Sequence, residues 1–144
     1  GFTALDFAKF HPGGALGKRL YLKVEDVFPG TPQPIVSPQA NLTEIIFEIS
    51  SKRLGATAVV QKNKLLGIIT DGDLRRMMQK NTRFEKLKAS DIMTQSPKTV
   101  ERNTMAVEAL ALMKTHNITQ LVVTDGEKFL GFVHLHDLLK EGII

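Results

Sequence analysis

The feature that most constrains this chain is an internal repeat. When the 144-residue sequence is shifted by 64 positions, many residues of its first part fall on identical residues of its second part. The matched pairs are Val36 and Val100, Glu44 and Glu108, Val59 and Val123, Lys64 and Lys128, Leu66 and Leu130, Gly67 and Gly131, Asp73 and Asp137, and Leu74 and Leu138. Similarity at a fixed offset indicates a duplicated structural unit. Because units of about 60 residues are small for separate cores, we expect them to pack together as a pseudo-twofold pair.

Each repeat has the pattern of a strand, a helix, two strands and a final helix, which predicts an α/β (α+β) fold. The first strands are expected at 34–36 and 98–100. The first helix of repeat one is expected to start at Asn41, which forms a capping box with Glu44. Its buried face is predicted from the spacing of Leu42, Ile45, Ile46 and Ile49, and the equivalent face from Ala106, Ala109, Leu110 and Met113, with Thr104 as the cap.

A hairpin and a short helix complete each repeat. The strands are predicted at 57–60 and 65–69 in the first repeat, and at 121–124 and 129–133 in the second. The turn Asp125–Gly126 is a strong hairpin signal, because both residues tolerate a positive φ angle. The final helices are expected at 71–79 and 135–140.

Composition narrows the possible partners. The chain has a formal net charge of +4 and a sequence pI near 9.4, a mild excess that favours anionic ligands. We expect no nucleic-acid partner, because one tyrosine and no tryptophan leave little for base stacking. The absence of cysteine excludes disulfide scaffolds and thiolate metal sites and fits a cytoplasmic location. The apolar runs are too short for a bilayer, so we expect no membrane contact. Because the sequence begins with Gly1 instead of methionine, we expect a piece of a longer protein.

The junction between the last strand and last helix of repeat one is a candidate ligand site. The free N–H groups of the first helical turn can bind an anion, and the Thr70 hydroxyl can donate to a phosphate oxygen. The Asp73 carboxylate can accept two hydrogen bonds from a ribose diol, with Asp71 beside it, and Arg75 and Arg76 can contact a phosphate or carboxylate. The alternative is that Thr70, Asp71 and Asp73 only cap the helix and that the arginines are solvated.

The second junction keeps the aspartate but changes its surroundings. Asp137 occupies the position of Asp73, whereas His134 replaces Thr70. His134, His136 and Asp137 invite a metal interpretation, but the sequence points to no further ligand, so we predict no metal site and favour a histidine that donates to a phosphate. Thr119 and Gln120, at the start of a strand, could contact a base, or they could simply begin that strand.

The repeated pattern Gly-apolar-apolar-Thr-x-x-Asp-apolar resembles the cystathionine-β-synthase (CBS) domain, whose tandem pairs are called Bateman modules. The resemblance covers about residues 24–140. It implies a nucleotide in a cleft between the repeats, with the aspartate on ribose and the Ser/Thr on phosphate. Those roles map onto Thr70 and Asp73. In repeat two Asp137 fits the pattern and His134 departs from it.

Residues 6–20, with the string His-Pro-Gly-Gly at 11–14, resemble the end of the sugar-isomerase domain of bacterial arabinose-5-phosphate isomerases, and residues 70–76 and 134–139 resemble the same family. The resemblance implies a linker and domain end at 1–22, CBS domains at 23–80 and 81–144, and a catalytic domain elsewhere in the same chain. His11 resembles an active-site histidine of that domain. We expect no isomerase activity and no cofactor in this fragment.

The family makes the precursor of 3-deoxy-D-manno-octulosonate (Kdo), so the resemblance implies CMP-Kdo as a feedback ligand. Two alternatives stay open. The pair could sense adenine nucleotides, or it could serve only to assemble a homo-oligomer, as a dimer of CBS pairs within a tetrameric parent.

Overall fold

The computed structural model describes residues 21–29, 33–52, 54–80 and 83–143. Its contacts divide the chain into two compact units. Among the described residues, we call those from 33 to 98 with 127–129 the repeat-1 unit, and those at 21–29, 99–126 and 130–143 the repeat-2 unit.

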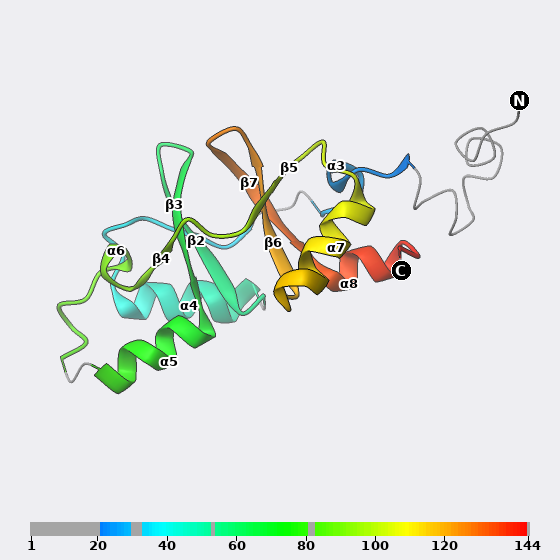
Figure 1. The fold of residues 1–144 in the computed structure, drawn as a ribbon. Coiled ribbons are helices and arrows are strands. Elements are labelled where there is room, and N and C mark those ends of the chain that lie inside the picture. Colours follow the sequence, from blue (N-terminus) through cyan, green and yellow to red (C-terminus); the bar gives the residue numbers. More distant parts are fainter. Residues whose placement is uncertain (1–20, 30–32, 53, 81–82, 144) are drawn as a thin grey trace, which may run out of the picture. The chain divides into compact units, whose positions relative to one another are not determined.

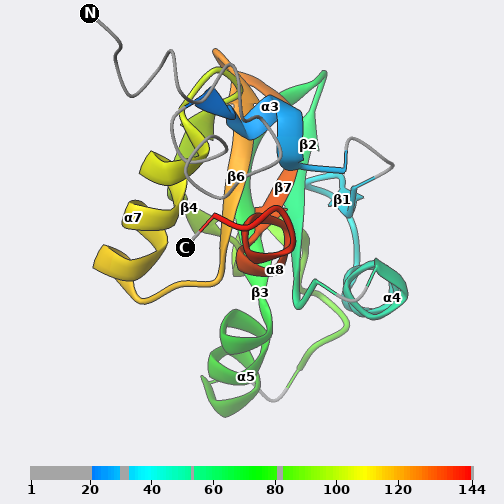
Figure 2. The same cartoon turned by 90° about the vertical axis from the view of Figure 1, so that its right-hand side faces the viewer.

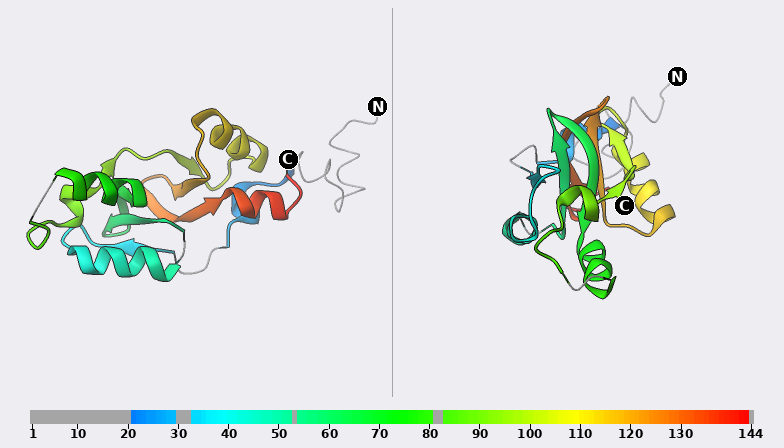
Figure 3. Two further views of the ribbon diagram at one scale, coloured as in Figure 1. Left: turned by 90° about the horizontal axis from the view of Figure 1, so that it is seen from below. Right: turned by 90° about the vertical axis from the view of Figure 1, so that its left-hand side faces the viewer.

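The repeat-1 unit is a small sheet with helices packed on it (Figure 1). Its elements are β1 (Ile35–Val36), α4 (Leu42–Lys52), β2 (Ala56–Gln61), β3 (Lys64–Thr70), α5 (Asp71–Lys80), α6 (Ala89–Ile92) and β4 (Thr94–Gln95). Strand β2 pairs in parallel with β1 and antiparallel with β3, and β4 pairs with the other edge of β3. Helix α4 contacts β1 and β2, and it runs alongside β1 in the left view of Figure 3.

The repeat-2 unit has the same core order of strand, helix, strand, strand and helix. It contains α3 (Val24–Val27), β5 (Thr99–Glu101), α7 (Ala106–His116), β6 (Gln120–Asp125), β7 (Lys128–His134) from residue 130 onward, and α8 (Leu135–Lys140). Helix α7 contacts β6 and α8, and Figure 2 shows it beside β6. Val100 pairs with Val123 just as Val36 pairs with Val59, so the duplicated sequence produces a duplicated register. The predicted order of strand, helix, strand, strand and helix is therefore confirmed.

Two short helices each precede one repeat in sequence but pack in the unit of the other repeat. Helix α3 precedes repeat one but packs against α7 of the repeat-2 unit, where Val24 N donates to Thr104 O at 2.8 Å. Helix α6 precedes repeat two but packs in the repeat-1 unit, where Ala89 N donates to Ala40 O at 2.9 Å. The sequence boundaries 1–22, 23–80 and 81–144 stay a prediction, because the compact units do not follow chain order.

The predicted buried faces are largely confirmed. All four apolar residues predicted for α7 are buried, as are Ile45 and Ile49 of α4. Ile46 was predicted to be buried and is 39% exposed, because the apolar spacing is wider than the stripe that α4 buries. Within the described residues, no helix has the length and apolar character that crossing a bilayer requires.

Of the two predicted helix caps, one is confirmed and the other is wrong. Glu44 N donates to Asn41 Oδ1 at 2.9 Å and Asn41 N donates to Glu44 Oε1 at 3.3 Å, which confirms the capping box. The cap predicted at Thr104 is wrong. Helix α7 has Met105 at its N-cap, with no side-chain hydrogen bond, because the backbone of Thr104 is engaged with Val24 and Glu101.

This difference predicts the outcome of a matched pair of substitutions. Asn41→Ala removes a cap acceptor and should lower the free energy of unfolding by about 1 kcal/mol. Thr104→Ala should change it by less than about 0.5 kcal/mol, because no side-chain cap is lost. Urea unfolding followed by circular dichroism measures both, and equal losses for the two variants would contradict the assignment of the caps.

Candidate functional site

At the first junction, Thr70 and Asp73 cap helix α5 reciprocally. Thr70 N donates to Asp73 Oδ2 at 2.9 Å, and Asp73 N donates to Thr70 Oγ1 at 3.2 Å. The Thr70 hydroxyl itself donates to Asp73 Oδ2 at 3.1 Å. The arrangement is a capping box at the point where strand β3 ends and the helix begins.

The Asp73 carboxylate collects two further donors on its other oxygen. Arg76 Nη2 donates to Oδ1 at 2.8 Å, and Thr94 Oγ1 donates to the same atom at 2.9 Å. Asp73 is only 8% exposed, and the four donors fill the roughly four acceptor positions that an ionised carboxylate offers. A ribose diol would therefore have to exchange with one of these donors before it could bind Asp73.

These contacts set the ionisation of Asp73. Burial acts to raise the pKa of the carboxyl, but the hydrogen bonds from Thr70 N, Arg76, Thr94 and the Thr70 hydroxyl outweigh it and hold the pKa below its ordinary value. Asp73 is therefore an anion at neutral pH, which matches its role as an acceptor.

Sequence reasoning missed Thr94. This residue lies on strand β4, which follows α6 in the segment between the two repeats. This strand packs so tightly on β3 that a Cβ on Gly67 would lie 2.6 Å from Thr94 O. Glycine is thus required at that position of the Gly-apolar-apolar-Thr pattern. Because Thr94 is 21 residues from Asp73, no local pattern signals the contact.

Asp71 and Arg75 differ from Asp73 in being exposed. Asp71 N donates to Gly55 O at 3.1 Å, and a Cβ on Gly55 would lie 3.2 Å from Asp71 Oδ2. The first junction thus lies against the start of β2. The Arg75 side chain makes no hydrogen bond or ion pair to another described residue, so it is available for an anion.

The second junction repeats this frame with different chemistry. His134 N donates to Asp137 Oδ2 at 2.8 Å, and His136 N donates to His134 Nδ1 at 3.0 Å. Leu135 N donates to Thr119 O at 2.7 Å, as Asp71 N does to Gly55 O in the other unit. The structure therefore brings Thr119 beside the histidine-capped start of α8. The His134 ring accepts an N–H of the first turn of α8 through Nδ1, which leaves Nε2 for the bond to a phosphate that was predicted for this histidine.

Gln120 carries the one unpaired buried side-chain oxygen found in the described part of the chain. Its Oε1 atom is buried and has no hydrogen-bond partner. At the equivalent position, 64 residues earlier, stands Ala56. Gln120 is thus one of the predicted site residues, and its unpaired oxygen is a property that only the tertiary structure shows.

Two other expectations concern the histidines. Among the described residues no group of three His, Asp or Glu side chains is placed to hold a metal ion, so His134 and His136 have no third ligand there. Strand β7 ends at His134 and helix α8 starts at Leu135, which removes the strand alternation that a paired-histidine site would need. His11 lies outside the described residues.

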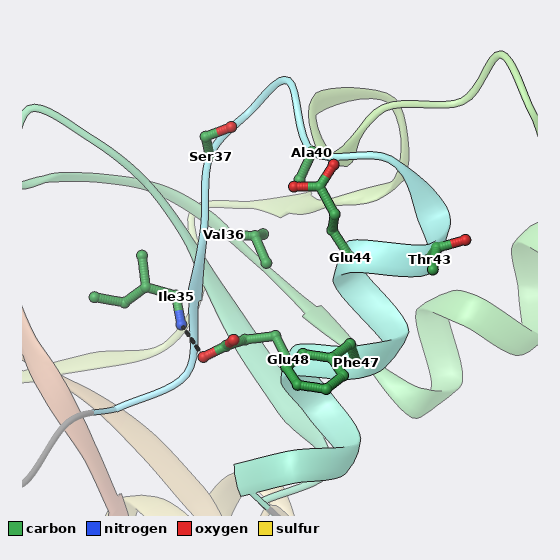
Figure 4. Close-up of a pocket in the computed structure, with 8 residues that line it drawn as sticks. All are labelled: Ile35, Val36, Ser37, Ala40, Thr43, Glu44, Phe47 and Glu48. Atoms are coloured by element: carbon green, nitrogen blue, oxygen red, sulfur yellow. Dashed lines mark hydrogen bonds between the residues drawn. The ribbon is translucent and has the colours of Figure 1, made fainter.

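Two pockets lie within the repeat-1 unit. The larger, of about 450 Å³, is a groove between β1 and α4 (Figure 4). It is lined by Ile35, Val36, Ser37, Ala40, Thr43, Glu44, Phe47 and Glu48, none of which was predicted as a site residue. The smaller, of about 220 Å³, is lined by residues that include Asp73 and Arg76 of the first junction, together with Lys80 and Asp91.

The chain belongs to the CBS domain family. The family model for the CBS domain matches residues 24–80 and again residues 89–143, so each sequence repeat is one CBS domain. This match confirms the family resemblance seen in the sequence and the mixed α/β fold class.

The comparisons also identify specific similar proteins. The arabinose 5-phosphate isomerase KdsD of Yersinia pestis is 44% identical over 146 residues, which cover 100% of this chain and 44% of that protein. KdsD of Francisella tularensis is 46% identical over 141 residues, covering 96% of this chain and 43% of that protein. The chain thus spans less than half the length of the curated relatives it matches. A CBS domain protein from Pyrobaculum aerophilum complexed with AMP has a TM-score of 0.71 at 20% identity, covering 81% of this chain and 90% of that chain.

The lowered pKa of Asp73 predicts how stability depends on pH. The stabilisation is fully present above the ordinary carboxyl pKa, and it is lost as the pH falls through the lower pKa of the folded state. Asp73→Asn should lower the free energy of unfolding by about 1–3 kcal/mol at pH 7 and flatten its dependence on pH in the acidic range.

Glu85→Gln is the matched control, because it removes the same charge from an exposed side chain. Chemical unfolding of both variants and the parent from pH 7 down to pH 3 gives the comparison. An unchanged acidic slope in Asp73→Asn would show that the carboxylate does not hold the junction.

Proposed function

We propose that this CBS pair is the nucleotide-binding regulatory module of an arabinose 5-phosphate isomerase, and that it binds CMP-Kdo as a feedback ligand. The observation that carries the proposal is the 44% identity to KdsD across the whole chain. The AMP complex of a structurally similar CBS protein supports a nucleotide as the class of ligand. The catalytic sugar-isomerase domain is the proposed intramolecular partner, and a cytoplasmic location without nucleic acid belongs to the same proposal.

The chemistry of CMP-Kdo matches the groups at the two junctions. The ligand offers a ribose diol to the carboxylate of Asp137, or to that of Asp73 in exchange for one of its four donors, and a phosphate to a helix start or to the Thr70 hydroxyl in exchange for its bond to Asp73. Its sugar carboxylate suits Arg75, whose guanidinium has no partner among the described residues, or Arg76. The net charge of +4 adds a general attraction for such an anion.

Isomerisation needs an acid–base pair beside a sugar carbonyl. We assign that chemistry to the catalytic domain of the parent enzyme, so the 144-residue chain should bind without turning over a sugar phosphate. Adenine nucleotides are the alternative ligands, since AMP is the ligand in the Pyrobaculum aerophilum structure.

Isothermal titration calorimetry of the 144-residue chain tests the proposal. CMP-Kdo should release or absorb heat on binding and raise the melting temperature, and Arg75→Ala should weaken its affinity by roughly tenfold, since a charge-assisted hydrogen bond is lost. Arg83→Ala is the control, because it removes the same charge from an exposed arginine outside α5.

The possible outcomes separate the ligands. Neither heat nor a thermal shift with millimolar CMP-Kdo would reject it as the ligand. Tighter binding of AMP or ATP than of any cytidine compound would select the adenine alternative. Equal weakening by the two arginine variants would remove the specific role of Arg75.

We also propose that the module self-associates, as part of an oligomeric parent. Exposed apolar side chains on helices favour this role, notably Phe47, which is 70% exposed on α4, and Met78 and Leu139, which are 49% and 48% exposed on α5 and α8. Contiguous exposed apolar area marks association surfaces, and Phe47 lines one groove together with the exposed Ile35.

Phe47→Gln should therefore shift the chain toward monomer. The weight-average mass from sedimentation equilibrium should fall at a fixed concentration, because the variant loses apolar area that a second copy would bury. Ser50→Gln, at another exposed position of α4, should leave the mass unchanged. A monomeric parent chain at all concentrations would exclude assembly as a function of these residues.

A further inference from the structure

The side-chain oxygen of Gln120 is a hydrogen-bond acceptor that has no donor in the described part of the chain. Its Oε1 atom is buried and unpaired, whereas buried polar atoms in folded proteins are almost always hydrogen-bonded. An unpaired buried amide oxygen lowers stability, and a donor from outside the chain, either a water molecule or a ligand, removes that cost. A bound ligand that carries an N–H or O–H group satisfies such an atom.

In the chain, Gln120 is the neighbour of a residue that contacts the candidate site of the repeat-2 unit. It directly follows Thr119, whose carbonyl accepts from Leu135 N at 2.7 Å at the start of α8. Two residues further along α8 lies Asp137, and the bond from His134 N to Oδ2 is the one hydrogen bond recorded for its carboxylate among the described residues. Among the described residues, the segments that meet at the second junction thus carry two acceptors with free capacity, the Gln120 amide oxygen and the Asp137 carboxylate.

The first junction offers neither acceptor. Ala56 stands where Gln120 stands in the second repeat, and the Asp73 carboxylate already accepts from four donors. The two repeats therefore differ in what they can recognise, although their folds match. Recognition of ligand donors belongs to repeat two.

The donors on a nucleotide are few. At neutral pH, AMP and CMP donate only through the ribose hydroxyls and the exocyclic amino group of the base, since their phosphate and ring nitrogens accept. A diol is best matched by the two oxygens of a carboxylate, which leaves the amino group for a neutral amide oxygen. Adenine and cytosine both carry that group, whereas hypoxanthine and uracil have a keto oxygen in its place.

We propose that Gln120 Oε1 accepts a hydrogen bond from the exocyclic amino group of the base, and that Gln120 is the residue that selects amino-bearing over keto-bearing nucleotides. The inference rests on the proposed nucleotide binding and deepens it. It applies equally to CMP-Kdo and to an adenine nucleotide, because it concerns a group that both bases share. In the same pose a keto base would place its oxygen against Oε1, and the base would have to shift before its adjacent ring N–H could donate to that atom.

Matched nucleotide pairs test the proposal on the 144-residue chain. Calorimetry should give tighter binding of AMP than of IMP, and of CMP than of UMP, by roughly tenfold in each pair. Gln120→Met, similar in size but without the amide, should reduce both ratios to about one. Gln120→Glu keeps an acceptor and should preserve the preference for the amino base.

The melting temperature of the unliganded protein gives an independent readout. Gln120→Met should raise it, because the substitution removes an unpaired buried oxygen, whereas Gln61→Met at the exposed end of β2 should not alter either the ratios or the stability. A fall in melting temperature for Gln120→Met would show that the amide is satisfied within the protein, and it would overturn the proposal.

The outcomes distinguish this proposal from the one on which it rests. Failure of all four nucleotides and of CMP-Kdo to bind would reject nucleotide binding, and the role of Gln120 with it. Binding without discrimination between amino and keto bases would reject Gln120 alone. Preference for IMP and UMP would show that the amide presents its nitrogen to the ligand, and this too would overturn the assignment.

Discussion

The buried carboxylate of Asp73 is the interaction on which the repeat-1 unit depends. It joins the end of β3, the first turns of α5 and the separate strand β4 through donors from Thr70, Arg76 and Thr94. Burying a carboxylate is costly unless its lone pairs are filled, and here four donors fill them. The same bonds that fix the fold therefore decide the chemistry of this junction, since they leave the carboxylate no free acceptor position.

The second repeat has the same backbone arrangement at its junction but carries different polar side chains there. His134 stands for Thr70, Gln120 for Ala56 and Leu139 for Arg75, at the same offset of 64 residues. The first junction is consequently rich in cations, whereas the second holds acceptors with free capacity. Duplication allows this division because one copy can carry the structural hydrogen bonds while the other changes its polar groups.

The short helices α3 and α6 are exchanged between the repeats. Each packs in the unit of the repeat that it does not precede, so each unit needs a segment from outside its own repeat. Helix α6 and strand β4 come just before repeat two in sequence, yet they complete the sheet and the Asp73 network of the repeat-1 unit. Helix α3 completes the core around α7 in the same way, through the buried side chain of Val24. Each repeat is about 60 residues long, which is short for a stable core of its own. The exchanged helix adds apolar contacts to that core.

The sequence by itself determined the duplication, the order of elements, the capping box at Asn41 and the buried face of α7, because these depend on local periodicity and on residues three or four positions apart. It also singled out Asp73, Asp137 and Gln120. Only the tertiary structure decided that Thr94 fills the acceptors of Asp73, that Thr104 does not cap its helix, that Ile46 faces outward and that Gln120 keeps an unpaired oxygen. Each of these depends on which distant backbone or side chain lies within hydrogen-bonding or van der Waals reach, and that proximity is created by packing between segments that no short-range pattern links.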